Sequence, residues 1–108
     1  MPYWYAVASS TPVYVRIIYS AAQAAAGATV RNAVIFQVTD ASGIGLATAN
    51  PRVAPLEGGG RLRGVYSADI EIPGGYIADV VLGRQAGNNV FQIDAGAATA
   101  TFTIQGIR

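Results

Sequence analysis

The chain has 108 residues, of which 52% are hydrophobic and 12% are charged, and its formal net charge is +1. A chain of this length forms a single domain, residues 1–108, and so apolar a composition excludes intrinsic disorder. The sequence contains no His and no Cys, which excludes thiol and serine–histidine nucleophiles and zinc sites built on these ligands. The seven basic residues are scattered arginines, and no apolar run approaches about 18 residues, so we expect neither nucleic-acid binding nor membrane insertion.

Residues 1–12 are expected to be a linker or an added edge of the domain. The start of the chain lacks the charged and apolar regions of a secretory signal. Three aromatic residues follow one another there, and aromatic rings stack on sugars or pack on protein surfaces. For Tyr3, Trp4 and Tyr5 we expect packing on the domain's own edge or contact with a preceding domain. Binding of a sugar by these three rings is the alternative.

Strands are predicted wherever apolar and polar residues alternate with a period of two and β-branched or aromatic residues are frequent. Five segments show this pattern clearly and two show it weakly, which gives, in chain order, strands near 13–19, 33–39, 51–54, 61–67, 76–82, 90–95 and 98–105. In the first strand one face carries Val13, Val15, Ile17 and Tyr19. The register predicts a core of Phe36, Val38, Val80, Leu82, Phe91, Ile93, Phe102 and Ile104, with Gln37, Asp79, Gln92, Thr101 and Thr103 pointing outward.

The alanine-rich segment 20–29, "SAAQAAAGAT", interrupts these strands. Alanine favours helices, but the run is short, ends at Gly27 and has no amphipathic period. We interpret it as a loop or an irregular edge, with one helical turn as the alternative.

Glycine, proline and asparagine clusters separate the strands, as expected for turns. Short alternating strands with such connections indicate an all-β, two-sheet antiparallel sandwich of about seven strands. Because successive strands reverse direction, an odd number of strands predicts that Val13 and Gly106 lie toward opposite ends of the sandwich.

Asp40 ends the strand in "VIFQVTDASG", residues 34–43, and has two interpretations. Calcium sites bring several carboxylates together within one loop, whereas Asp40 has only Ser42 as a nearby side-chain oxygen. In an Asx-turn the carboxylate accepts hydrogen bonds from backbone N–H groups and a glycine takes a positive φ. We therefore predict a structural turn at Asp40 and Gly43, with no metal and no cofactor.

Two further segments contain residues that could form a binding or catalytic site. The run Gly58-Gly59-Gly60-Arg61-Leu62-Arg63 lacks the spacing of a phosphate-binding loop and is predicted to be a flexible hairpin loop rather than an anion cradle. Asp69 and Glu71 are two residues apart, and we interpret them as a solvated edge rather than a glycosidase pair, which would need carboxylates from separate elements across a cleft. No catalytic residue is predicted.

The order of several motifs between Gln23 and Gly106 resembles the group 1 bacterial immunoglobulin-like domains, the repeated modules of invasin- and intimin-type surface proteins. The matching pieces are "VTDASG" at 38–43, the cluster Gly58–Gly60, the strand from Gly75 to Leu82-Gly83, "AGNNV" at 86–90 and "ATATFTIQG" at 98–106. The resemblance implies an immunoglobulin-like sandwich at the cell surface or outside the cell. It also implies a non-catalytic spacer or adhesion module whose partners are neighbouring domains, or a surface protein or glycan. A carbohydrate-binding accessory module and a self-assembling fibre subunit remain alternatives.

Overall fold

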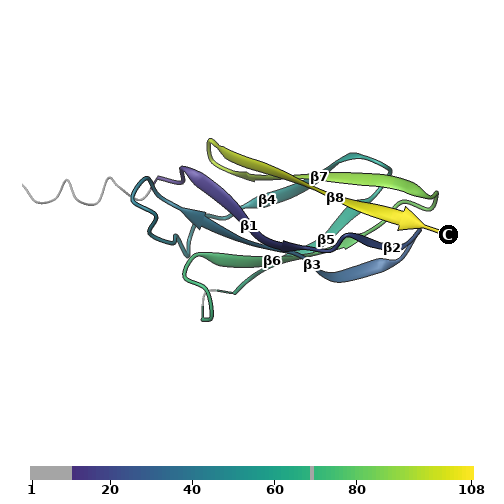
Figure 1. The fold of residues 1–108 in the computed structure, drawn as a ribbon. Helices are drawn as coiled ribbons and strands as arrows, with labels where there is room; N and C mark the ends of the chain where they lie inside the picture. The colour runs from purple at the N-terminus through teal and green to yellow at the C-terminus, as the bar shows by residue number, and fades with distance from the viewer. Residues whose placement is uncertain (1–10, 69) are drawn as a thin grey trace, which may run out of the picture.

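The computed structural model describes residues 11–68 and 70–108 and is built of strands in two facing layers (Figure 1). The strands are β1 (Tyr14–Ser20), β2 (Gln23–Ala25), β3 (Thr29–Thr39), β4 (Arg52–Glu57), β5 (Arg61–Ser67), β6 (Gly75–Val81), β7 (Gly87–Ala95) and β8 (Ala98–Ile107). The first sheet has the order β1-β3-β6-β5 and the second has the order β2-β8-β7-β4. This arrangement is that of an immunoglobulin-like sandwich, so the predicted fold class is confirmed.

All seven predicted strands are present, and the structure adds β2 within the alanine-rich segment. This edge strand is three residues long and pairs parallel with β8, whereas the other strand pairs are antiparallel. The Gln105 N–H donates to the Ala22 carbonyl at 2.9 Å, and the Ala26 N–H donates to the Ile107 carbonyl at 2.7 Å. Bonds to a neighbouring strand thus outweigh the helix propensity of alanine, and none of the described residues is helical. In particular, the described part of the chain contains no helix of the length and hydropathy needed to cross a membrane.

The core lies between the sheets and contains all eight side chains predicted to be buried. Two cross-strand ring pairs fill its centre. Phe36 and Tyr76 stack with their centroids 5.7 Å apart, and Phe91 and Phe102 stack at 5.2 Å. The outward residues follow the same register, because Gln37, Asp79 and Gln92 are half-buried and Thr101 and Thr103 are exposed.

The alternation predicted for the first strand is wrong at Tyr19. A β-bulge between Ile17 and Tyr19 shifts the register of β1 against β3. Val15 and Ile17 pack against the core as the alternation requires, but Tyr19 lies on the outer side and is 51% exposed. A bulge inserts one residue, so every side chain after it changes face.

The chain enters and leaves the sandwich at opposite ends (Figure 1). Pro12 lies beside Gly96 in the β7–β8 turn, whereas Gly106 pairs with Gly87 at the open end of the same hairpin. The ten residues of β8 span roughly 30 Å at about 3.3 Å per residue. We call the end with Pro12, Asp40 and Gly96 the amino pole, and the end with Gly58, Gly83 and Gly106 the carboxyl pole. The extra strand β2 does not alter this outcome, because it continues in the direction of β1 and runs parallel to β8.

Candidate functional site

Asp40 closes the turn at the amino pole and is 5% exposed. Its Oδ1 accepts hydrogen bonds from the N–H groups of Ser42 at 2.8 Å and Ile44 at 3.0 Å. The Gly43 N–H donates to the Asp40 carbonyl at 3.0 Å, and Gly43 has a φ of 84°. This is the geometry of an Asx-turn with a glycine in the left-handed region.

The turn that Asp40 organises is packed against the connection between β5 and β6. The Leu46 N–H donates to the Val38 carbonyl at 2.9 Å, and the Val38 N–H donates to the Gly74 carbonyl at 3.0 Å. A Cβ on Gly45 would overlap the Pro73 carbonyl. Within residues 11–68 and 70–108 there is no group of three or more acidic residues placed to hold a metal ion. The arrangement therefore shapes the backbone of the amino pole.

The carboxyl pole is closed by Asn89, a residue that was not predicted from the sequence. This side chain is 1% exposed and its Oδ1 accepts a hydrogen bond from the Gly83 N–H at 2.9 Å. Its Nδ2 donates to the Gly87 carbonyl at 3.3 Å and to the Ile104 carbonyl at 3.4 Å. The sequence contains one indication of this. Asn89 lies two and four residues before Phe91 and Ile93, and alternate residues of a strand share a face, so Asn89 is expected on the buried face.

The glycine run at 58–60 does not form the predicted hairpin loop. It joins β4 of the second sheet to β5 of the first, so it crosses between layers. Gly60 is buried against the ring of Phe91, and a Cβ on Gly58 would overlap the Asn88 carbonyl. Close packing of backbone against backbone explains why glycines stand here. The predicted hairpin was wrong because β4 pairs with β7 and β5 pairs with β6, so the two strands that flank the run do not pair with each other.

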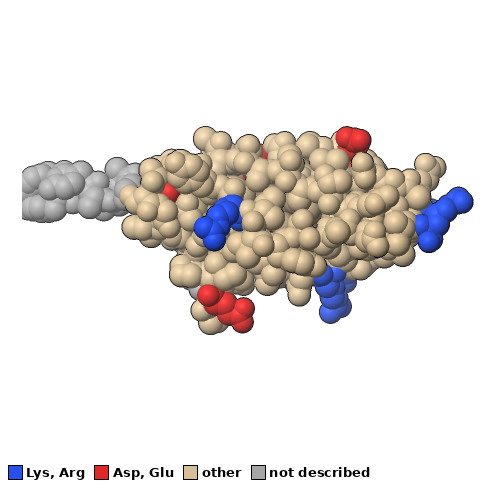
Figure 2. All heavy atoms as spheres, viewed as in Figure 1, with Lys and Arg blue, Asp and Glu red and all other residues tan. Residues whose placement is uncertain are grey.

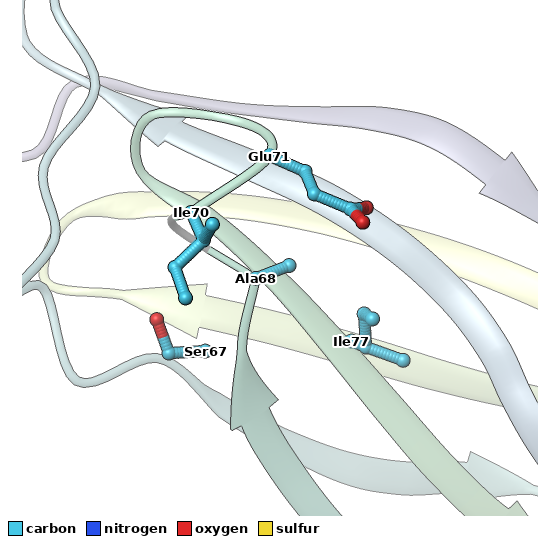
Figure 3. A pocket seen from close by; sticks show the side chains of 5 residues that line it. All are labelled: Ser67, Ala68, Ile70, Glu71 and Ile77. Atoms are coloured by element: carbon cyan, nitrogen blue, oxygen red, sulfur yellow. The ribbon is translucent and has the colours of Figure 1, made fainter.

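A hollow of about 440 Å³ lies on the outer face of the first sheet, under the β5–β6 connection. It is lined by Ser67, Ala68, Ile70, Glu71 and Ile77 (Figure 3). Glu71 is exposed, and Asp69, its suggested partner in sequence, lies outside the described residues. The lining therefore presents one described carboxylate, the Ser67 hydroxyl and aliphatic side chains.

A second hollow of about 400 Å³ at the carboxyl pole is lined by Arg84, Gln85, Ala86 and Arg108. On the face seen in Figure 2, single basic and acidic side chains are separated by broad uncharged areas. The face in this view therefore shows no continuous basic stripe of the kind that binds nucleic acid.

The aromatic residues Tyr3, Trp4 and Tyr5 lie outside the described residues. Packing on the domain, contact with a preceding domain and sugar binding thus stay predictions for this segment.

Comparison with known proteins gives matches to solved structures alone. No family model and no curated protein sequence matches the chain. A structure of domains 4 and 5 of the S-layer protein SbsC matches over 91% of this chain and 54% of that one, with a TM-score of 0.65 and 16% identity. A structure of domains 1–6 of SbsC matches over 90% and 13% of the two chains, with a TM-score of 0.65 and 16% identity.

The adhesin FdeC of Escherichia coli matches over 86% of this chain and 29% of its own, with a TM-score of 0.64 and 17% identity. The present chain thus spans about half the length of the first SbsC structure and less of the other two chains. At these identities the likeness shows a common fold. The sandwich is of a kind that also occurs within an S-layer protein and within an adhesin.

Proposed function

We propose that the chain is a non-catalytic structural or adhesion module of a bacterial cell-surface or secreted protein, and that it acts as a spacer. The observation that carries this proposal is the separation of the two poles. The chain enters beside Gly96 and leaves beside Gly87, at opposite ends of one hairpin. A module of this geometry adds roughly 30 Å to a string of modules, because the chain enters at one end of the long axis of the sandwich and leaves at the other.

The comparisons support the same proposal without deciding it. Two of the matched structures are pieces of an S-layer protein with several domains, and the third is an adhesin. By analogy of fold, the expected partners are neighbouring domains of a longer protein, with a surface protein or glycan as a further partner. The expected location is the cell surface or the extracellular space.

In this proposal Asp40 and Gly43 have a structural role. The carboxylate oxygen Oδ1 already accepts two backbone hydrogen bonds, and the side chain is almost fully buried. A buried carboxylate satisfied in this way stabilises its turn without a metal ion. We infer that the turn keeps the amino pole rigid where a preceding domain would meet it.

Two measurements test the proposal separately. An antibody raised against the folded chain should label intact, unpermeabilised cells of the source bacterium, and labelling only after permeabilisation would reject the surface location. Two copies joined end to end should show, by small-angle X-ray scattering, a maximum dimension larger than that of one copy by roughly 30 Å. A tandem that folds back to nearly the length of one copy would reject the spacer role.

A further inference from the structure

The fold gathers at the carboxyl pole arginines that are scattered in the sequence. Five of the seven arginines lie within three residues of a strand end at this pole, and we call them the basic cluster: Arg31, Arg61, Arg63, Arg84 and Arg108. The described acidic residues in the same half are Glu57, at the end of β4, and Asp79 of β6. Five positive and two negative side chains leave this half with a net charge of +3.

The amino half has the opposite balance of charge. Among the described residues, Arg16 and Arg52 stand there with Asp40, Glu71 and Asp94. The net charge of the whole chain is only +1, so the basic excess belongs to one end of the molecule. In Figure 2 a basic side chain projects from the carboxyl pole, at the right of the view.

The turn after β2 brings Arg84 and Arg108 to one hollow. The Gly27 N–H donates at 2.7 Å to the carbonyl of Gly83, the residue before Arg84, and a Cβ on Gly27 would lie 3.9 Å from the Arg84 Cα. Ala26 donates its N–H at 2.7 Å to the carbonyl of the residue before Arg108. Both arginines therefore line the hollow of about 400 Å³ on backbone that hydrogen bonds hold in place.

The glycine crossing adds Arg61 to the same pole. A Cβ on Gly83 would overlap the Gly58 carbonyl, so the crossing that leads into Arg61 packs on the connection that carries Arg84. Arg61 begins β5 and pairs with Val81 at the end of β6. Three connections distant in sequence thus place arginines side by side.

The other two members of the cluster lie on the strands that flank β6. Arg31 is exposed on β3, and Arg61 and Arg63 are exposed on β5. With β6 between them, the backbones of β3 and β5 are about 10 Å apart. Asp79 of β6 is the carboxylate in this region, and its Oδ1 accepts a hydrogen bond from the Asn32 N–H at 2.8 Å.

The charges of the basic cluster are not neutralised within the described part of the chain. All five arginines are exposed, and none of their guanidinium groups makes a hydrogen bond or ion pair with another described residue. The planar guanidinium carries five donors in a fork that matches the oxygens of phosphate and carboxylate groups. The pole therefore offers a set of unused donors on anchored backbone, which suits oxyanions.

We propose that the basic cluster binds a polymer with repeated phosphate groups. Arginines from several connections and strands fit a chain of anions better than a single ion. A phosphate group has oxygens on all sides, so it accepts donors that approach from different elements. This binding goes beyond the spacer role, and the choice of a polymer at the cell surface rests on the location given under the proposed function.

The surroundings of the cluster disfavour nucleic acid as this polymer. A duplex needs a continuous basic stripe, whereas the cluster is compact and lies at the tip of the molecule. Single strands bind by stacking their bases on aromatic rings. The exposed tyrosines of the described chain lie on strands away from this pole, at Tyr14, Tyr19 and Tyr66.

Isothermal titration calorimetry of the purified chain with linear polyphosphate tests the proposal. We expect binding whose logarithmic affinity falls linearly with the logarithm of the salt concentration, because phosphate contacts release counterions. Inorganic phosphate, the probe with a single group, should bind at least about a hundredfold more weakly, since it engages only part of the cluster. Absence of polyphosphate binding at low salt, or equal affinity for inorganic phosphate, would overturn the proposal.

A matched pair of variants locates the site. Arg84→Gln with Arg108→Gln should lower the affinity for polyphosphate at least about tenfold and reduce its salt dependence. The control, Arg16→Gln with Arg52→Gln, removes the same charge from the amino half and should change the affinity by less than about twofold. All four side chains are exposed, and circular dichroism must show the same fold in both variants. Equal losses in the two variants would reveal a response to net charge alone and would reject the site.

Two other polyanions of equal charge test the choice of ligand. Polyglutamate carries carboxylates, and an oligothymidylate carries bases beside its phosphates. Tighter binding of either one than of polyphosphate would overturn the phosphate polymer as the ligand. These titrations use the single chain in solution, so their failure is distinct from a failure of the spacer role, which scattering from the tandem tests.

Discussion

The two poles of the sandwich are each closed by one buried polar side chain, but the two side chains reach over different distances in the sequence. Asp40 at the amino pole holds the N–H groups two and four residues ahead of it. Asn89 at the carboxyl pole joins Gly83, six residues before it, to Ile104, fifteen residues after it. The first is a local turn and the second is a tertiary contact.

The two poles therefore differ in how many other elements must be folded before each can form. The Asp40 turn can form as soon as its own few residues are ordered. The carboxyl pole requires β7, β8, the connection after β6 and the glycine crossing to be in place together. Damage at the carboxyl pole should therefore cost more stability than damage at the amino pole.

Loss of a core ring should have the largest effect and should act equally at both poles. Phe36 belongs to the first sheet and Phe102 to the second, and both are buried. Phe36→Ala and Phe102→Ala should each lower the free energy of unfolding by about 3–5 kcal/mol. Urea unfolding measures this, with the exposed Thr103→Ala as a control expected to change it by less than about 0.5 kcal/mol. A small effect of either phenylalanine would mean that the sheets do not share one core.

Gly83→Ala should have the next largest effect, because it breaks the packing of the carboxyl pole. Its Cβ would overlap the Gly58 carbonyl, and a backbone neighbour cannot rotate away. We expect a loss of about 3 kcal/mol, at the upper end for overpacking. Gly43→Ala is the counterpart at the amino pole, where no atom lies near the added Cβ and only the φ of 84° is strained. It should cost about 1 kcal/mol, and the reverse order in urea unfolding would contradict the comparison.

Asn89→Ala should lower stability by about 2 kcal/mol, because the buried Gly83 N–H loses its acceptor. The control is Gln92→Ala on the same strand. Gln92 is half-buried and its amide donates to the Asp94 carboxylate, so about 0.5 kcal/mol or less is expected. Amide hydrogen exchange adds a local measurement: the Gly83 N–H should lose protection in the Asn89 variant. Unchanged protection there would show that Asn89 does not hold the pole.

Asp40→Ala should cost about 1 kcal/mol, the usual value for a lost side-chain acceptor at a turn. Asp40→Asn keeps the accepting oxygen and should retain most of that stability. Thermal unfolding of the three proteins decides the order. An Asn variant as unstable as the Ala variant would mean that the charge of Asp40, and not its hydrogen bonds, matters.

Calcium should have no effect on the melting temperature of the unaltered chain. The Asp40 carboxylate is used by the backbone, and any ligand that binds only the folded state raises its stability. A melting curve with millimolar calcium, compared with one in chelator, makes the test. An upward shift in calcium that disappears in the Asp40→Ala variant would replace the turn by a metal site.

The sequence predicted what depends on neighbours along the chain. Strand alternation placed Phe91 and Ile104 in the core because the period of two is a local property of extended backbone. The bulge before Tyr19 could not be predicted in this way, because it is a shift in the pairing of β1 with β3 and β1 alone does not show it. The short strand β2 could not be predicted either, because its three alanine-rich residues show no strand pattern and are extended through their pairing with β8.

The candidate sites divide in the same way. The geometry at Asp40 arises from residues 40–44, so the motif itself could suggest it. In the sequence Asn89 resembles a turn residue. Its burial depends on contacts with Gly83, after β6, and with Ile104 of β8, which are distant in the chain.

The parallel pairing of β2 with β8 determines how the sandwich resists a pull. Tension between Pro12 and Ile107 would reach β2 from the amino pole, through β1, and would reach β8 from the carboxyl pole. The rungs at Gln23–Gln105, Ala24–Gly106 and Ala25–Ile107 lie across the line of force. Their hydrogen bonds are therefore sheared together, whereas a hairpin pulled at its open end breaks its bonds one after another. The shortest strand of the fold thus lies on the path of the force, after the pairing of β1 with β3, and resists it by shear.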